Sequence, residues 1–273
     1  MKKLRWILVV LLLAGLACST LSGGDDPADN TLPDPGENAG SADNSTAADD
    51  DSAEAGGDIT VSSDIGTDSA CYTAYFPVNR DVSWTYEISS PASETIEYQV
   101  MITDVSDDSF TSTSVHPNFS AELIWQCGPD GLFSSDFSQF DLSEVIGDVV
   151  DVGEITIDGV TLPKDDLWAV GYSWITHFEL SMDLSVEGIA METFTVVDIT
   201  NTITAVESVT VPAGTFPEAY RVEQTGSITM NMMGVELPIP INTTTWYVKN
   251  VGMIKSVSED EFGTSTTVLV SVD

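Results

Sequence analysis

Basic residues are scarce in this chain. Its 273 residues include 8 Lys and Arg and 2 His against 44 Asp and Glu, which gives a formal net charge of -36 at pH 7. A protein that binds nucleic acid needs a basic surface to neutralise phosphates. The lack of such a surface excludes nucleic acid as a partner.

Catalytic and cofactor motifs are also missing. The chain has no Gly-x-Ser-x-Gly elbow, no HExxH zinc motif and no glycine-rich phosphate loop. His116 and His177 lie in expected strands, where a structural role is favoured. Carboxylates are too numerous for any pair to be singled out for acid–base catalysis. We therefore expect no catalytic residue, no metal site and no cofactor.

The longest apolar run lies near the N-terminus. Lys2, Lys3 and Arg5 precede the apolar residues 6–17, an order typical of an export signal. A run of this length is too short for a membrane-spanning helix, which needs about 20 residues. The sequence therefore predicts an exported protein with residues 1–17 as its signal peptide.

The signal peptide ends next to a cysteine. The stretch Gly15-Leu16-Ala17-Cys18 resembles the lipobox of bacterial lipoproteins, in which cleavage before the Cys leaves a residue that carries diacylglycerol. Gly15 stands where the lipobox usually has Leu, and ordinary signal-peptide cleavage after Ala17 is the alternative. The resemblance implies that Cys18 carries fatty acyl chains such as palmitate. It also implies an anchor on the outer face of a bacterial membrane, with the N-terminal lipid as the membrane contact.

Cysteine itself is rare, with 3 in the chain. Lipidation of Cys18 leaves Cys71 and Cys127, an even pair in an exported protein. We expect these two to form a disulfide that closes a loop of about 57 residues, worth about 4 kcal/mol in the chain-entropy model. Two buried free thiols are the alternative.

Residues 19–68 contain no aromatic and no basic residue. They hold 13 acids and abundant Ser, Gly, Ala and Asn, and so cannot bury enough apolar surface to offset the entropy of ordering. We expect a disordered linker over residues 18–68. Calcium binding by Asp49, Asp50 and Asp51 is the weaker alternative, because the EF-hand spacing is missing.

From residue 69 the composition changes to short alternating runs rich in Thr, Val, Ile and aromatics. Residues 84–88 and 96–102 place an apolar side chain at every second position, as a strand with one buried face requires. Further strands are expected at 109–116, 119–127, 153–162, 172–184, 189–211, 217–232, 240–249, 251–258 and 263–272. Residues 69–273 are thus predicted to be all-β, an antiparallel sheet curved into a sandwich or half-barrel. We expect one or two short helices at most, one within 136–150.

The tryptophans raise the hypothesis of two duplicated halves. Trp84 and Trp174 each follow a Ser, and Trp125 and Trp246 each precede a Gly by the same spacing. The order is the same in both halves, although the second pair is more widely separated. Chance recurrence of a hairpin pattern is the alternative.

Three short segments carry a family resemblance. They are residues 75–78 with 84–86, 211–216 with 220–222, and 245–247 with 251–256. These segments are similar to the TapB-like group of uncharacterised bacterial lipoproteins, and the resemblance implies an exported β-rich domain with no established activity. Asn250 stands where a Gly is expected in the last hairpin, but Asn tolerates positive φ better than most residues.

The best candidates for contact with an apolar ligand lie in one hairpin. Met side chains adapt to irregular apolar surfaces, and the candidates are Met230, Met232 and Met233 with Leu237 and Ile239. A hairpin packed in the core is the alternative. For Arg221 a structural ion pair is favoured over an anion site.

The function expected from these observations is non-enzymatic. A lipid-anchored envelope protein would bind a hydrophobic or polymeric ligand or another envelope component. A structural or assembly role at the cell surface is the alternative, and an extracytoplasmic hydrolase is less favoured. The sequence does not identify the ligand or the protein partner.

Overall fold

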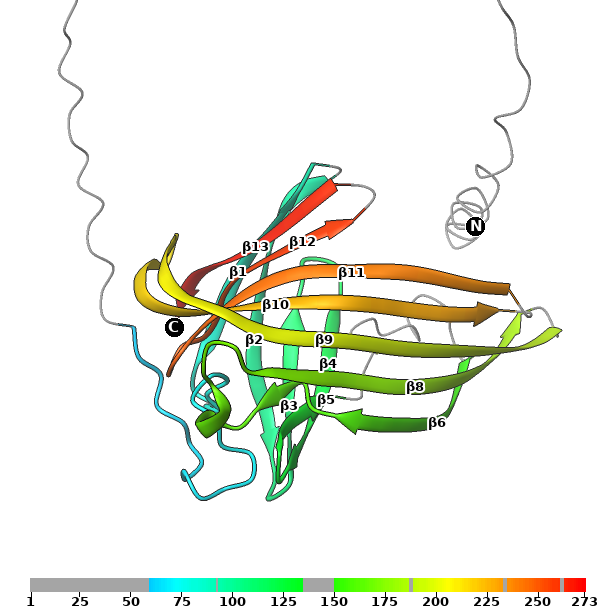
Figure 1. Cartoon of the computed structure of the whole chain (residues 1–273), viewed down its shortest axis with the longest axis horizontal. Helices are drawn as coiled ribbons and strands as arrows, with labels where there is room; N and C mark the ends of the chain where they lie inside the picture. The colour runs from blue at the N-terminus through cyan, green and yellow to red at the C-terminus, as the bar shows by residue number, and fades with distance from the viewer. Residues whose placement is uncertain (1–58, 92, 135–149, 187–188, 233–234, 261–262) are drawn as a thin grey trace, which may run out of the picture. The chain divides into compact units, whose positions relative to one another are not determined.

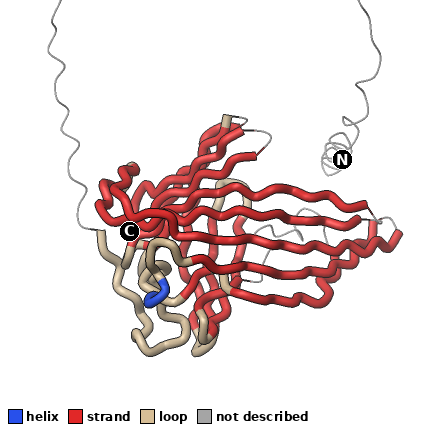
Figure 2. Tube along the Cα trace, in the orientation of Figure 1, coloured by secondary structure: helices blue, strands red, loops and turns tan. Residues whose placement is uncertain are grey.

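The computed structural model describes residues 59–91, 93–134, 150–186, 189–232, 235–260 and 263–273. Within these ranges 13 strands form one antiparallel sheet that does not close into a barrel (Figure 1). The helical content of the described residues is a single 3-10 turn at Asp165–Leu167 (Figure 2). The predicted all-β antiparallel class is therefore confirmed. Most of the helix expected at 136–150 lies outside the described residues.

The strands match the alternating segments of the sequence closely. In chain order they are β1 (Ser83–Ser90), β2 (Ser93–Val105), β3 (Ser109–Val115), β4 (Ser120–Gly128), β5 (Gly131–Ser134), β6 (Val150–Gly159), β7 (Leu162–Pro163), β8 (Ser173–Val186), β9 (Ile189–Val211), β10 (Gly214–Met232), β11 (Val235–Val248), β12 (Gly252–Asp260) and β13 (Gly263–Val272). The sequence did not predict β5 and β7, because 4 and 2 residues are too few to display a period-2 pattern.

The sheet consists of two runs of consecutively paired strands, β1 to β5 and β8 to β13, joined where β13 pairs with β1. Trp84 lies on β1 and Trp174 on β8, the first strand of each run. Trp125 lies on β4 and Trp246 on β11, the fourth strand of each run. Duplication of the two halves stays a prediction.

One short segment connects the two edges of the sheet. The outermost strands are β6 and β7, which follow each other in the chain. Between them, the Val160 N–H donates to the Ile175 carbonyl on β8 at 3.2 Å, and the Thr161 N–H donates to the Leu132 carbonyl on β5 at 2.8 Å. The far ends of the two runs are therefore held together at residues 160–161.

A row of polar side chains crosses the inner face of the second run. Asn201 is 1% exposed and donates to Thr176 Oγ1 at 3.0 Å, while its own Oδ1 accepts from Gln224 Nε2 at 2.9 Å. Gln224 Oε1 in turn accepts from Thr245 Oγ1 at 3.2 Å, and Thr245 lies 3.2 Å from Ser256 Oγ. Each buried polar group thus has a partner on the neighbouring strand, which offsets its desolvation.

The last residues of the predicted linker form hydrogen bonds with the folded domain. Val61 is 5% exposed, and its N–H donates to the Asn250 carbonyl at 2.6 Å. The Asp64 N–H donates to the Val78 carbonyl at 2.7 Å. Both bonds belong to residues of the predicted linker, and its composition does not reveal that they pair with distant backbone. The boundary after residue 68 stays a prediction. The signal peptide, Cys18 and the linker up to residue 58 lie outside the described residues.

The segment before β1 is also attached covalently. Cys71 is fully buried and forms a disulfide with Cys127 on β4, with the two Cα atoms 4.7 Å apart. This is the pair predicted from the sequence. The same segment contacts the β11–β12 turn, where the Asn250 N–H donates to the Ala74 carbonyl at 2.6 Å. Asn250 has a φ of 60°, as its place in that turn predicts.

No helix among the described residues is long and apolar enough to cross a bilayer.

Candidate ligand-binding site

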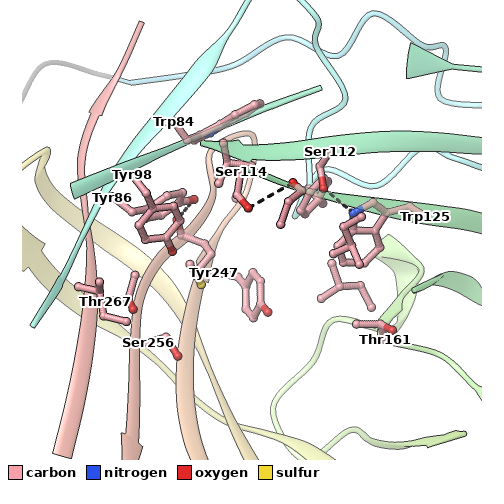
Figure 3. Close-up of a pocket in the computed structure, with 18 of the residues that line it drawn as sticks. Trp84, Tyr86, Tyr98, Ser112, Ser114, Trp125, Thr161, Tyr247, Ser256 and Thr267 are labelled. Atoms are coloured by element: carbon pink, nitrogen blue, oxygen red, sulfur yellow. Dashed lines mark hydrogen bonds between the residues drawn. The ribbon is translucent and has the colours of Figure 1, made fainter. Parts of the chain in front are cut away.

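A cavity of about 580 Å³ lies between the inner face of β1 to β4 and the β11–β12 turn (Figure 3). Successive side chains of a strand point to opposite faces, so alternate residues of each strand line it. These residues are Trp84, Tyr86 and Ile88 on β1, Tyr98 and Val100 on β2, Ser112 and Ser114 on β3, and Ala121, Leu123 and Trp125 on β4. The small side chains of β3 and β4 leave the space that the aromatic rings enclose.

The cavity has a buried floor and an exposed mouth. Trp84, Leu162 and Val251 line the floor and are each 5% exposed or less. Phe119, between β3 and β4, also lines the cavity and is 40% exposed. The open side therefore lies at Phe119.

Hydrogen bonds to the protein hold the polar atoms of the deeper rings. Trp84 Nε1 donates to the Val251 carbonyl at 2.8 Å, and the Tyr86 hydroxyl donates to the Met253 carbonyl at 2.9 Å. Trp125 Nε1 donates to Ser112 Oγ at 3.0 Å (Figure 3). With these atoms satisfied, the rings present mainly carbon to the cavity.

Four aromatic rings form a stack from the floor to the mouth. Tyr86 and Tyr98 have centroids 5.5 Å apart with planes at 26°, and Tyr98 and His116 are 4.6 Å apart at 11°. His116 and Phe119 complete the stack at 4.3 Å and 12°. The stack thus joins buried Tyr86 to the exposed ring of Phe119.

The cavity wall is uncharged. Among the described residues that line it, none is Asp, Glu, Lys or Arg. Desolvation lowers the pKa of the His116 imidazole, so this ring is neutral at pH 7. Desolvation raises the pKa of Tyr247 to about 12, and it raises that of Tyr98 to about 12 although a hydrogen bond with Thr267 acts in the opposite direction. The wall therefore stays neutral across the physiological pH range.

Two lining residues keep free hydrogen-bonding groups. In the part of the chain that the structure describes, the Tyr247 hydroxyl and the ring nitrogens of His116 have no hydrogen-bond partner. Tyr247 lines the cavity (Figure 3). His116 also lines it and stacks on Phe119 near the mouth. These groups can hydrogen-bond to an uncharged polar group of a ligand.

The hairpin predicted to contact a ligand lies elsewhere. Met230 on β10 is half-buried opposite Leu237 on β11, and Leu237 and Ile239 are 48% and 46% exposed. None of these three lines the cavity. Met232 ends β10, and Met233 lies outside the described residues. A role of this hairpin in ligand contact stays a prediction.

The remaining candidates for chemistry lie apart from the cavity. His177 Nδ1 lies 2.7 Å from Asp198 Oδ1, but the Asp198 side chain is 63% exposed and neither residue lines the cavity. Arg221 forms the favoured ion pair, with Glu223 at 2.7 Å. No group of three or more His, Cys, Asp or Glu within the described ranges is placed to hold a metal ion.

Sequence reasoning missed the cavity. Ser112, Ser114 and Ala121 alternate on the inward face of β3 and β4, opposite rows of large aromatics. Small residues at inward positions next to Trp and Tyr were the available signal. Their spacing alone does not reveal whether a neighbouring element fills the gap.

The fold and the cavity define an all-β domain with an uncharged internal pocket. The chain belongs to the DUF3108-like family, whose model matches residues 84–269. The TapB-like name given by the resemblance is not confirmed, because the matching family model carries the DUF3108-like description. No curated protein matches the chain.

Two solved structures are similar to this chain. One is a putative lipoprotein from Parabacteroides distasonis, 19% identical with a TM-score of 0.44, covering 73% of this chain and 98% of that one. The other is a putative exported protein with a YmcC-like fold from Bacteroides fragilis, 14% identical with a TM-score of 0.44 and the same coverages of 73% and 98%.

Proposed function

We propose that this domain binds an uncharged, largely apolar small molecule in the cavity formed by β1 to β4. The observation that carries the proposal is an uncharged wall around about 580 Å³ of space in a chain of net charge -36. Small-molecule sites have volumes of about 300–1,000 Å³ and are lined mostly by apolar and aromatic side chains. Size and lining both support a ligand site.

The packing of ordinary cores supports the same conclusion. Protein interiors reach the density of organic crystals and leave few voids larger than a water molecule. Here core-like residues such as Trp84, Tyr86 and Trp125 surround a space that is much larger. An apolar occupant restores the dispersion contacts that these side chains otherwise lack.

The binding test uses two neighbouring residues of β4. N-phenyl-1-naphthylamine is an uncharged dye whose fluorescence increases in apolar sites. Leu123 lines the cavity, whereas Ile124 points to the opposite face and is 48% exposed. We expect the wild type to bind the dye, Leu123→Glu to weaken binding at least tenfold and Ile124→Glu to leave it unchanged.

Circular dichroism and thermal unfolding check that both variants fold. If Leu123→Glu does not fold, Leu123→Trp replaces it, because a larger ring occupies the same space. No dye binding by the wild type, or equal losses in the variants at 123 and 124, would refute the proposal.

We also propose that the domain acts outside the cytosol, anchored to a membrane through Cys18. The apolar residues 6–17 followed by Cys18 support export and lipidation. The Cys71–Cys127 disulfide supports an oxidising compartment. Cells grown with a labelled fatty acid should label the wild type and Cys71→Ala but not Cys18→Ala. An unlabelled wild type, or a labelled Cys18→Ala variant, would refute the anchor.

A further inference from the structure

We infer that the cavity takes one unbranched aliphatic chain that carries an uncharged head group, as in a neutral monoacyl lipid. The inference rests on the proposed function and names the class of its ligand. It follows from three features of the cavity: how its rings are stacked, how it opens, and which charges surround it.

The stacking of the rings favours an aliphatic ligand over a sugar ring. Tyr98 lies between Tyr86 and His116, and His116 lies between Tyr98 and Phe119. The faces of the two inner rings are therefore covered by protein, and their edges remain for the cavity. A sugar ring gains most from stacking on an open aromatic face, whereas a methylene chain needs only close apolar contact.

Trp125 provides no open platform either. Phe110 stacks on it at 5.8 Å with planes at 11°, and Phe76 packs against it at 4.8 Å. Leu162 and Val251 at the floor of the cavity present aliphatic surface. The deep part of the cavity thus suits the tail of the ligand.

The opening places the head group. Phe119 is 40% exposed at the mouth, while Trp84 at the floor is 5% exposed. A chain that enters tail first leaves its polar end beside His116, whose ring nitrogens have no described partner. The neutral imidazole can donate or accept one hydrogen bond to a hydroxyl or ester oxygen.

The surrounding charge excludes an anionic head. None of the described lining residues is a cation, and from residue 69 onward the chain has 31 acids and 5 Lys and Arg. A fatty-acid carboxylate or a phosphate at the mouth would meet a negative field without a partner. An uncharged head group avoids this cost.

The test is displacement of N-phenyl-1-naphthylamine from the wild-type domain. The competitors are 1-monoacylglycerols from decanoyl to palmitoyl, the free fatty acids of equal length and phenyl glucoside. For the monoacylglycerols we expect affinity to rise about fourfold per methylene until the cavity is full. At pH 8 the matching fatty acids should bind at least tenfold more weakly, and phenyl glucoside should not displace the dye.

A pair of variants on β3 tests the tail position. Ser114 lines the cavity, and Thr113 points to the other face. Ser114→Phe should shift the preference to shorter chains, whereas Thr113→Phe should leave the wild-type preference. If Ser114→Phe does not fold, the competition series with the wild type still tests the ligand class through its dependence on chain length.

The possible failures are distinguishable. If the dye does not bind, the proposed function fails. If the dye binds but affinity is independent of chain length, the named ligand class is wrong and the proposed function stands. The same holds if phenyl glucoside displaces the dye, or if fatty acids bind as tightly as the monoacylglycerols.

Discussion

Tyr75 and Trp168 stack face to face, with ring centroids 3.7 Å apart and planes at 13°. Tyr75 lies in the segment before β1, and Trp168 lies in the segment before β8. The pair therefore connects the two segments that precede the first strand of each run. Trp168 also meets the rings of Tyr220 and Tyr247 edge-on, and its Nε1 donates to the Pro163 carbonyl at 3.1 Å. This contact connects the core of both runs.

Removing the Trp168 ring should destabilise the whole domain. Trp168 is 6% exposed, and a buried Trp replaced by Ala costs about 3–5 kcal/mol. Urea unfolding followed by circular dichroism measures the change. Val170→Ala is the control: Val170 is 59% exposed, and its replacement should stay within about 0.5 kcal/mol. A loss below about 1 kcal/mol for Trp168→Ala would contradict this account of the core.

Breaking the disulfide should lower the stability of the domain. The Cys71–Cys127 bond attaches the segment before β1 to β4 with a sequence separation of 56. Closing a loop of this length restricts the unfolded chain and contributes about 4 kcal/mol. The variant with both Cys71→Ser and Cys127→Ser should unfold at lower urea than the wild type, and reductant should affect only the wild type. Equal midpoints for the two proteins would contradict the prediction.

The polar row across β8 to β12 should respond cooperatively to mutation. Asn201→Ala removes the donor to Thr176 Oγ1 and the acceptor of Gln224 Nε2. Because buried polar groups then lose partners, we expect a loss of about 1–3 kcal/mol. A double-mutant cycle with Gln224→Ala in urea unfolding should give a coupling energy of about 0.5–3 kcal/mol. Strict additivity would show that the two side chains act independently.

Alkaline pH should destabilise the domain through its buried tyrosines. Desolvation raises the pKa of Tyr98 and Tyr247 to about 12 from the usual 10.0, so the folded state keeps protons that the unfolded chain has lost. Their contribution is fully present below about pH 10 and is lost as pH rises through about 12. The free energy of unfolding should fall by up to about 1.4 kcal/mol per pH unit for each tyrosine.

Urea titrations between about pH 8 and about pH 11 measure this decrease. Tyr98→Phe removes one of these tyrosine ionisations, so its stability should fall less steeply with pH than that of the wild type. A wild-type stability that does not change above pH 10 would contradict the expected direction.

Local patterns in the sequence were sufficient to predict most strands of the sheet. Residues 189–211 were predicted as one strand and form β9 with those bounds, because a period-2 pattern is a property of neighbouring residues. The positive φ of Asn250 and the pairing of Cys71 with Cys127 also followed from residue type and count. The composition of the predicted linker did not reveal that the Val61 N–H donates to the distant carbonyl of Asn250, because that bond depends on residues far apart in the chain.

The sequence by itself determined the all-β class, the turns and the disulfide pair. Strands follow from the alternation of apolar and polar side chains, and turns follow from residues that tolerate positive φ. The disulfide pair follows from the count of cysteines. Only the tertiary structure decided where the cavity lies. Its wall combines Trp84, Leu123, Leu162 and Tyr247 from four separate parts of the chain. The distance between the two runs of strands decides whether the space in front of the inward-facing side chains is filled. No local sequence pattern predicts that distance.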